Sequence, residues 1–201
     1  MKLSGNIAML DEISQQSHSF AFRSDVSATN VSSKDALLVI IKLNVEGSNG
    51  FGTENTNIDD YFFVKEVFKR DATRVFRSRL GPVAEIGHSS EDLKPTNPKA
   101  TAKVAFVQFV DGSDWGNRAI AQDILRERGL TQAKMLGLLQ IYRKGGDQPF
   151  RAELLSESPL QTVQDLQRLY EESDGDAKIV VNKIKSMLSA ASQHRAGGLM
   201  R

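Results

Sequence analysis

The side-chain periodicity of this sequence changes near residue 115, and this change limits the folds that the chain can adopt. Between residues 19 and 110, the strongest segments alternate apolar with polar side chains, which is typical of half-buried β-strands. After Gly116, apolar side chains recur every three or four residues, which is typical of amphipathic helices. The sequence therefore predicts a β part followed by a helical part, rather than alternating βαβ units.

Five segments of the first part are predicted to be strands. Segment 18–26 places Phe20, Phe22 and Val26 on one face and charged residues on the other. Segment 36–46 has an unbroken apolar face and is predicted to be a central strand. The other predicted strands are 61–68, 73–80 and 102–110. Because no convincing helix lies between these short segments, they predict an antiparallel sandwich.

The second part is predicted to form a set of short helices. Ile120, Ile124 and Leu125 mark one helix, and a second is predicted to begin at Thr131 and to end at Gly145. Three further helices are predicted over 149–157, from Ser158-Pro159 through Tyr170, and after Asp174-Gly175-Asp176. The predicted domains are a sandwich over 17–116 and a helical region over 117–192, with flexible termini at 1–16 and 193–201.

Composition excludes several classes of protein. Hydrophobic residues make up 40% of the 201 residues, which is enough to bury a core and excludes wholesale disorder. The absence of cysteine excludes a disulfide scaffold, a cysteine nucleophile and thiolate metal sites. A formal net charge of +1 creates no whole-chain field that would attract nucleic acid, so nucleic acid is not the expected partner.

Neither a membrane span nor a signal peptide is expected. The longest apolar run, 36–41, is far shorter than the roughly 20 residues of a membrane-spanning helix, so no membrane insertion is expected. Asp11 and Glu12 follow the N-terminus before the apolar stretch of a signal peptide could form. We expect a cytoplasmic protein, or an exported one if a processed signal was removed.

No motif predicts a catalytic, cofactor-binding or metal-binding residue. Residues 87–91 begin like a nucleophile elbow, but Glu91 stands where that sharp turn requires a second glycine. Residues 54–60 carry oxygen-bearing side chains at alternate positions, as Ca²⁺ prefers, without the glycine and distant glutamate of an EF-hand loop. We interpret both as polar loops. The pattern Asn30-Val31-Ser32 fits a glycosylation acceptor, which is meaningful only in a secreted eukaryotic protein.

Three segments together carry a resemblance to known proteins. They are Thr29-Asn30-Val31-Ser32-Ser33-Lys34 leading into the apolar segment 36–45, then Asp60-Tyr61-Phe62-Phe63, and then 104–116. In this order they resemble a group of uncharacterised bacterial proteins, many of them exported. The resemblance covers about half of the chain and implies a mainly β plus α fold, an antiparallel immunoglobulin-like β-sandwich followed by a C-terminal set of short helices. It implies no catalytic residue.

The expected function is a non-catalytic binding or protein-interaction module with a protein partner. Its expected contact surfaces are the loops 47–60 and 81–99 and the apolar faces of the C-terminal helices. The residues predicted to contact a ligand or partner are Asn57, Asp59, Asp60, His88 and Trp115. For Trp115, the only tryptophan, packing in the core or at the junction of the two parts is the favoured alternative, because its side chain buries a large area.

Two other functions stay open. The first is a hydrolase, acting on glycans, that uses carboxylates such as Asp59, Asp60, Glu91 and Asp92, and it requires a pair of them about 5 to 10 Å apart in a cleft. The second is single-stranded nucleic-acid binding through the basic segment 65–79. It requires exposed aromatic rings among Phe62, Phe63, Phe68 and Phe76 on which bases could stack.

Overall fold

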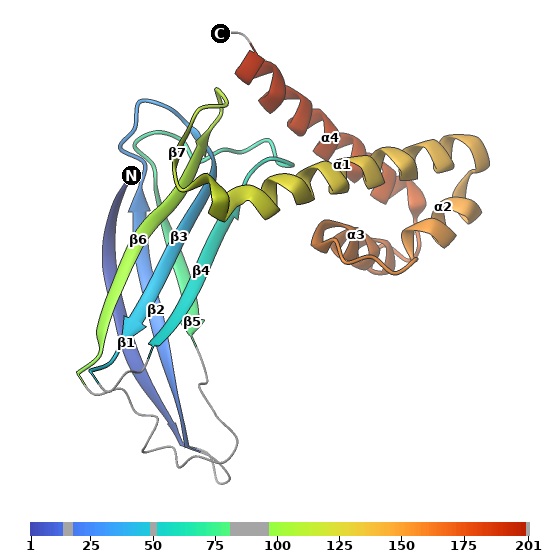
Figure 1. Cartoon of the computed structure of the whole chain (residues 1–201). Helices are drawn as coiled ribbons and strands as arrows, with labels where there is room; N and C mark the ends of the chain where they lie inside the picture. Colours follow the sequence, from blue (N-terminus) through green and yellow to red (C-terminus); the bar gives the residue numbers. More distant parts are fainter. Residues whose placement is uncertain (14–17, 49–51, 81–96, 200–201) are drawn as a thin grey trace. The chain divides into compact units, whose positions relative to one another are not determined.

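The computed structural model describes residues 1–13, 18–48, 52–80 and 97–199 (Figure 1). Within these ranges the chain forms two antiparallel sheets, of three and four strands, followed by four helices. It divides into two compact units. The two-sheet unit contains Met1–Asp60 and Val67–Asn117, and the helical unit contains Tyr61–Glu66 and Arg118–Arg201.

The three-stranded sheet has the order β1-β2-β5, with every neighbouring pair antiparallel. Its strands are β1 (Lys2–Ile13), β2 (His18–Thr29) and β5 (Thr73–Leu80). Val26 of β2 lies opposite Phe76 of β5, and both side chains are buried. Asp25, on the other face of β2, forms ion pairs at the surface with Arg23 and Arg77. The alternation of the sequence thus becomes a buried face and a charged face.

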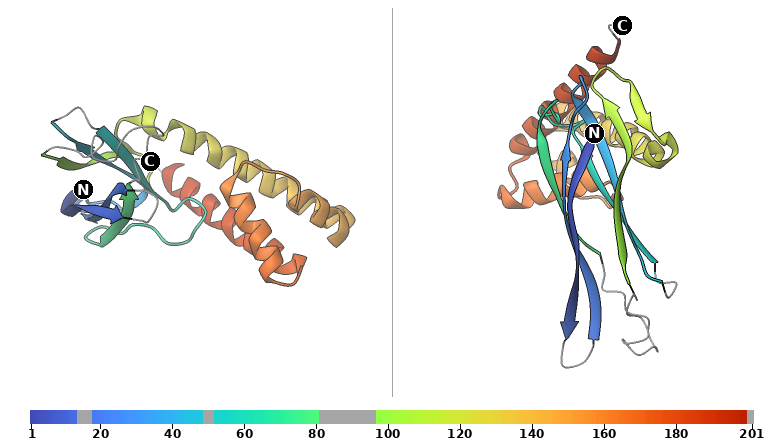
Figure 2. Two further views of the ribbon diagram at one scale, coloured as in Figure 1. Left: turned by 90° about the horizontal axis from the view of Figure 1, so that it is seen from below. Right: turned by 90° about the vertical axis from the view of Figure 1, so that its left-hand side faces the viewer.

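The four-stranded sheet has the order β4-β3-β6-β7 (Figure 2). Its strands are β3 (Ala36–Glu46), β4 (Gly52–Asp60), β6 (Lys99–Phe109) and the short β7 (Asp114–Gly116). The prediction that residues 36–46 form a central strand is confirmed, because β3 pairs with β4 on one side and β6 on the other. Both faces of β3 are buried from Ala36 to Ile41, which explains its continuous apolar sequence.

The predicted strand over 61–68 is wrong. Residues 61–66 form turns within the helical unit, and only Phe68 keeps strand pairing, as an isolated bridge to Ala36. Strand β4 occupies 52–60, where the sequence indicates a polar loop. A polar segment can form an edge strand, because its backbone hydrogen bonds to β3 do not depend on an apolar face.

Strand β1 was likewise not predicted from the sequence. It lies inside segment 1–16, which the sequence assigns to a flexible terminus, and pairs with β2 from Lys2 to Ile13. At Gly5, where φ is +146°, an added Cβ would lie 2.2 Å from the carbonyl oxygen of Asp25. Glycine at this position therefore reflects the close approach of two strands rather than a loop.

The helical unit contains α1 (Arg118–Gly145), α2 (Asp147–Leu154), α3 (Gln161–Glu172) and α4 (Ala177–Leu199). These helices pack on one another through a cluster of buried side chains. The cluster consists of Met135, Leu138, Phe150, Leu154, Leu166, Ala177, Val180, Val181 and Ile184. Among the described helices, none is long and apolar enough to cross a bilayer.

Three predicted helix limits need correction. The two helices predicted between residues 120 and 145 are one continuous helix, α1, because Gly129 lies in its interior without ending it. Helix α3 begins after Leu160 rather than at Ser158-Pro159, although the Ser158 hydroxyl still accepts a hydrogen bond from the Leu160 N–H, 3.3 Å away. Helix α4 continues to Leu199, beyond the predicted limit at 192.

Candidate functional site

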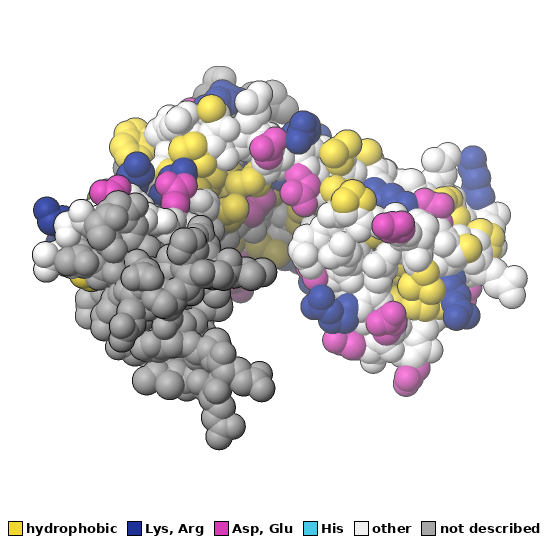
Figure 3. All heavy atoms as spheres, turned by 60° about the horizontal axis from the view of Figure 1, so that its bottom comes forward, with side chains coloured by type: hydrophobic (Ala, Val, Ile, Leu, Met, Phe, Trp, Pro, Cys, Tyr) yellow, Lys and Arg dark blue, Asp and Glu magenta, His cyan; other side chains and the backbone are white. Residues whose placement is uncertain are grey.

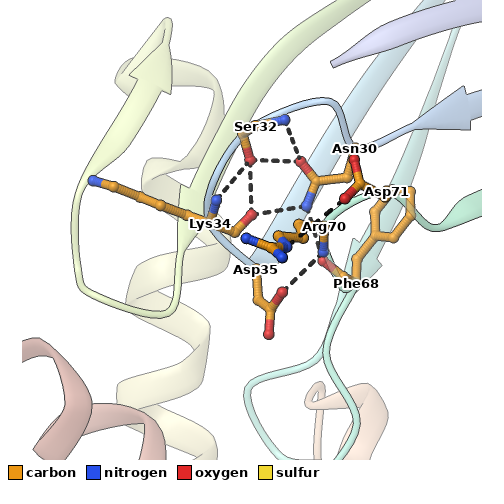
Figure 4. Close-up of polar contacts among 7 residues, drawn as sticks. All are labelled: Asn30, Ser32, Lys34, Asp35, Phe68, Arg70 and Asp71. Atoms are coloured by element: carbon orange, nitrogen blue, oxygen red, sulfur yellow. Dashed lines mark hydrogen bonds and ion pairs between the residues drawn. The ribbon is translucent and has the colours of Figure 1, made fainter.

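The loops at one end of the two-sheet unit are joined by hydrogen bonds around the buried side chain of Asn30 (Figure 4). Its Nδ2 donates to the carbonyl oxygens of Lys34 and Phe68, at 2.9 and 3.0 Å. Its Oδ1 accepts from the backbone N–H and the hydroxyl of Ser32, at 3.2 and 2.6 Å. All the hydrogen-bonding capacity of the amide is therefore used, and it ties the β2–β3 loop to the segment that precedes β5.

Backbone hydrogen bonds strengthen this connection. Phe68 exchanges two hydrogen bonds with Ala36, at 2.8 and 2.9 Å, and its side chain is completely buried. The Asp71 N–H donates to the Asn30 carbonyl oxygen at 2.7 Å, and the Arg70 N–H donates to Asp35 Oδ1 at 2.8 Å. The segment 67–72 is therefore held against the β2–β3 loop along its length.

The β6–β7 turn joins the same assembly through a salt bridge. Lys34 Nζ lies 2.7 Å from Asp111 Oδ2 and donates to the Ser113 hydroxyl at 2.9 Å. That hydroxyl donates in turn to Asp111 Oδ1, at 2.6 Å. Two hydrogen bonds hold the pKa of the Asp111 carboxyl well below its ordinary value. The one from Lys34 has the larger effect, and the one from Ser113 has the smaller. The Asp111 side chain is only 13% exposed, so water screens this pair less than it would screen a surface pair.

We call residues 30–35, 67–72 and 110–113 the loop platform. Hydrogen bonds join residues 30–35 directly to each of the other two segments. Its surface includes exposed Val31, and the charged side chains of Arg70 and Asp71, which are 67% and 81% exposed. It is therefore a pre-formed surface that combines apolar and charged groups.

Trp115 lies on β7, directly after the loop platform in the sequence, and its residue is 59% exposed. Trp115 therefore does not pack in the core of the two-sheet unit. Its backbone is held in place, because β7 pairs Trp115 with Val107 of β6. The next residue, Gly116, has a φ of +99°, and a Cβ there would lie 2.4 Å from the Ala105 carbonyl oxygen. Only glycine therefore allows this close approach of β7 to β6.

The structure does not bring the five predicted contact residues together. Asn57, Asp59 and Asp60 lie on β4, and Trp115 lies on β7, at the opposite edge of the same sheet. His88 lies outside the described residues, as does the elbow-like segment 87–91 around it. Asp59 and Asp60 are consecutive in a strand, so their side chains point to opposite faces of the sheet.

The residues required for a hydrolase are not assembled in the described part of the chain. Asp59 and Asp60 point away from each other, and Glu91 and Asp92 lie outside the described residues. Among the residues that the structure describes, no three or more His, Asp or Glu side chains gather where they could hold a metal ion.

The aromatic rings proposed for base stacking take part in packing. Phe68 and Phe76 are buried in the two-sheet unit, and Phe62 is buried in the helical unit, where the Arg128 guanidinium lies 4.7 Å from its ring centroid. Phe63 packs against the helical cluster. On the face shown in Figure 3, basic and acidic side chains are interspersed.

No sequence pattern considered above predicts that the three segments of the loop platform meet. Lys34 and Ser113 are separated by 79 positions, so no local pattern could pair them. A local signal did exist at Asn30, because asparagine followed two residues later by serine is also typical of an Asx turn. The buried amide of Asn30 makes that turn, which explains the glycosylation-like pattern.

Comparison with protein-family models, with curated proteins and with solved structures found no match for this chain. The resemblance to the bacterial immunoglobulin-like group therefore stays a prediction.

Proposed function

We propose that this chain is a protein-interaction module, and that the loop platform together with Trp115 is its contact surface. The observation that carries this proposal is the exposure of Trp115, 59%, on a strand whose backbone is held by pairing with β6. Tryptophan and arginine dominate the binding energy of protein interfaces, and exposed Arg70 lies on the platform. Because internal hydrogen bonds already order the loops, binding would require little additional ordering of the chain.

We further propose that the two sheets form an immunoglobulin-like sandwich. In that class, strands A, B and E share one sheet and strands C, F and G share the other, with C′ beside C in some members. Reading β1 to β7 in chain order as A, B, C, C′, E, F and G gives the observed sheets. On this reading the platform contains the B–C and F–G loops, which carry ligand contacts in antibody variable domains.

The test compares two single substitutions in the full-length chain. Trp115→Ser removes the indole from the proposed contact surface. Ile179→Ser is the matched control, because Ile179 is 44% exposed and lies on α4 in the helical unit. Each variant and the wild type are immobilised and exposed to the soluble proteins of the source cell, and bound proteins are quantified by mass spectrometry.

The proposal expects a defined set of proteins on the wild type that Ile179→Ser retains and Trp115→Ser loses by about tenfold or more. Equal capture by all three chains would contradict it. Loss with Ile179→Ser alone would instead assign binding to the helical unit. Circular dichroism of each variant verifies that the fold is retained.

A further inference from the structure

Strands β4 and β5 are edge strands of different sheets, and they lie at the same side of the two-sheet unit. Among the described strands, β4 pairs only with β3, and β5 pairs only with β2. The two edge strands also contact each other across the gap between the sheets (Figure 1). This side of the unit therefore presents two rows of backbone groups that can pair with another strand.

The two edge strands carry opposite charge. Strand β4 contains Glu54, Asp59 and Asp60 and no lysine or arginine. Strand β5 contains three arginines and no acidic residue. If β4 and β5 carried charge of the same sign, like charges would meet whenever β4 of one copy approached β5 of another. That repulsion would protect the two edges from pairing. Glu54 and Arg77 already form ion pairs within the chain, with Lys42 and Asp25. The opposite signs of the two strands mean that a second copy placed against this side would bring no like charges together.

Each edge strand also exposes one large apolar side chain. Ile58 of β4 is 49% exposed and Val75 of β5 is 52% exposed. Val75 lies on the face of its sheet opposite buried Phe76, and Ile58 alternates with half-buried Asn57 and Asp59. Both apolar side chains thus lie on the outer faces of their sheets.

We propose that two copies of this chain associate through this side about a two-fold axis parallel to the strands. Such an axis places β4 of each copy antiparallel to β5 of the other. The four-stranded sheet of each copy then continues into the three-stranded sheet of the other. The dimer therefore has two equivalent contacts, each between β4 of one copy and β5 of the other. At each contact the outer faces of the two joined sheets form one continuous surface. Ile58 of one copy and Val75 of the other lie on that same surface.

The side chains define the register. Placing Ile58 opposite Val75 of the second copy pairs two exposed apolar residues across the new contact. In an antiparallel pair the same register places Asp59 opposite Arg74 and Thr56 opposite Arg77, and no like charges meet. The overlap runs along the length of β5. Alternate residues of β5 direct their backbone groups to β2, so the other half of its eight residues would supply the main-chain hydrogen bonds to β4. This surface is separate from the loop platform, so the inference does not depend on the proposed function.

The test uses sedimentation velocity of the full-length chain from low to high micromolar concentration. The wild type is expected to form a dimer of twice the chain mass. Ile58→Asp and Val75→Lys each place a charge in the apolar pair, and both side chains are exposed enough to be replaced without disturbing the core. Each variant alone is expected to raise the dimer dissociation constant by about tenfold or more. Ile179→Asp, a matched charge addition on α4, is expected to leave it unchanged.

Mixing the two variants provides the decisive measurement. In a mixed dimer, one contact pairs the introduced aspartate with the introduced lysine, and the other keeps the natural isoleucine and valine, so dimerisation is expected to return. A wild type that stays monomeric at every concentration overturns the proposal. So does a dimer that survives both single substitutions, or a mixture that stays monomeric after both have abolished the dimer.

Discussion

The two units of this protein close their loops in different ways. In the helical unit the turns that follow α1 and α3 are closed locally: the Gly146 N–H donates to the Tyr142 carbonyl oxygen at 2.9 Å, and the Gly175 N–H donates to that of Tyr170 at 2.9 Å. In the two-sheet unit the loops are joined by residues far apart in sequence, such as Asn30 and Phe68, which are 38 positions apart. The stability of the helical unit therefore depends chiefly on its apolar cluster. The loop platform of the two-sheet unit also depends on a few polar side chains.

The largest expected effect concerns the apolar cluster of the helical unit. Phe150 is completely buried, and its ring packs edge-to-face against Tyr142 with 5.5 Å between centroids. Phe150→Ala is expected to cost about 3 to 5 kcal/mol of unfolding free energy, since it leaves a cavity. Urea denaturation followed by circular dichroism at 222 nm reports the helices, and fluorescence of Trp115 reports the two-sheet unit.

A shift of the circular dichroism transition alone would show that the two units unfold separately. An equal shift of both transitions would show that the two units unfold together and would contradict the contrast between them. Leu155→Ala is the control, because Leu155 follows α2 and is exposed, and its expected cost is below about 0.5 kcal/mol.

The second prediction concerns Asn30. Asn30→Ala removes both donors that satisfy the Lys34 and Phe68 carbonyl oxygens, so we expect a cost of about 2 to 3 kcal/mol in the fluorescence transition. Asn44→Ala is the matched control, because the Asn44 amide donates to Glu46 at the exposed surface. If Asn30→Ala lowers the unfolding free energy no more than Asn44→Ala does, the loop platform does not depend on the buried amide.

The smallest effect concerns Asp111 and depends on pH. Because its pKa is lowered in the folded state, the charged carboxylate stabilises the fold above the unfolded-state pKa of about 4, and this contribution is lost as the pH falls from that value toward the folded-state pKa. Asp111→Asn is expected to cost about 1 kcal/mol or less at pH 7, and progressively less below about pH 4. Urea denaturation of both chains at neutral, mildly acidic and strongly acidic pH measures this, and a difference that grows toward acidic pH would contradict it.

Much of the fold could be predicted from the sequence because it follows from one-sided burial. The strands predicted over 18–26, 36–46, 73–80 and 102–110 are confirmed as β2, β3, β5 and β6. In the described part of the chain, each region that forms a helix was likewise predicted to be helical, with errors at the limits and in the division of α1 into two helices. In each case the periodic pattern of side chains within a single segment indicates which of its faces is buried.

The remaining features were decided by contacts between distant segments. Polar β4 is a strand only because β3 pairs with it, and the aromatic residues Phe62 and Phe63 pack with helices rather than in a sheet. No local pattern records that Lys34 meets Asp111, or that Trp115 remains exposed. Which segments bury one face follows from the sequence alone, because that information is local and periodic. Which segments became neighbours, and so which polar side chains met, was decided only when the chain closed its long loops in three dimensions.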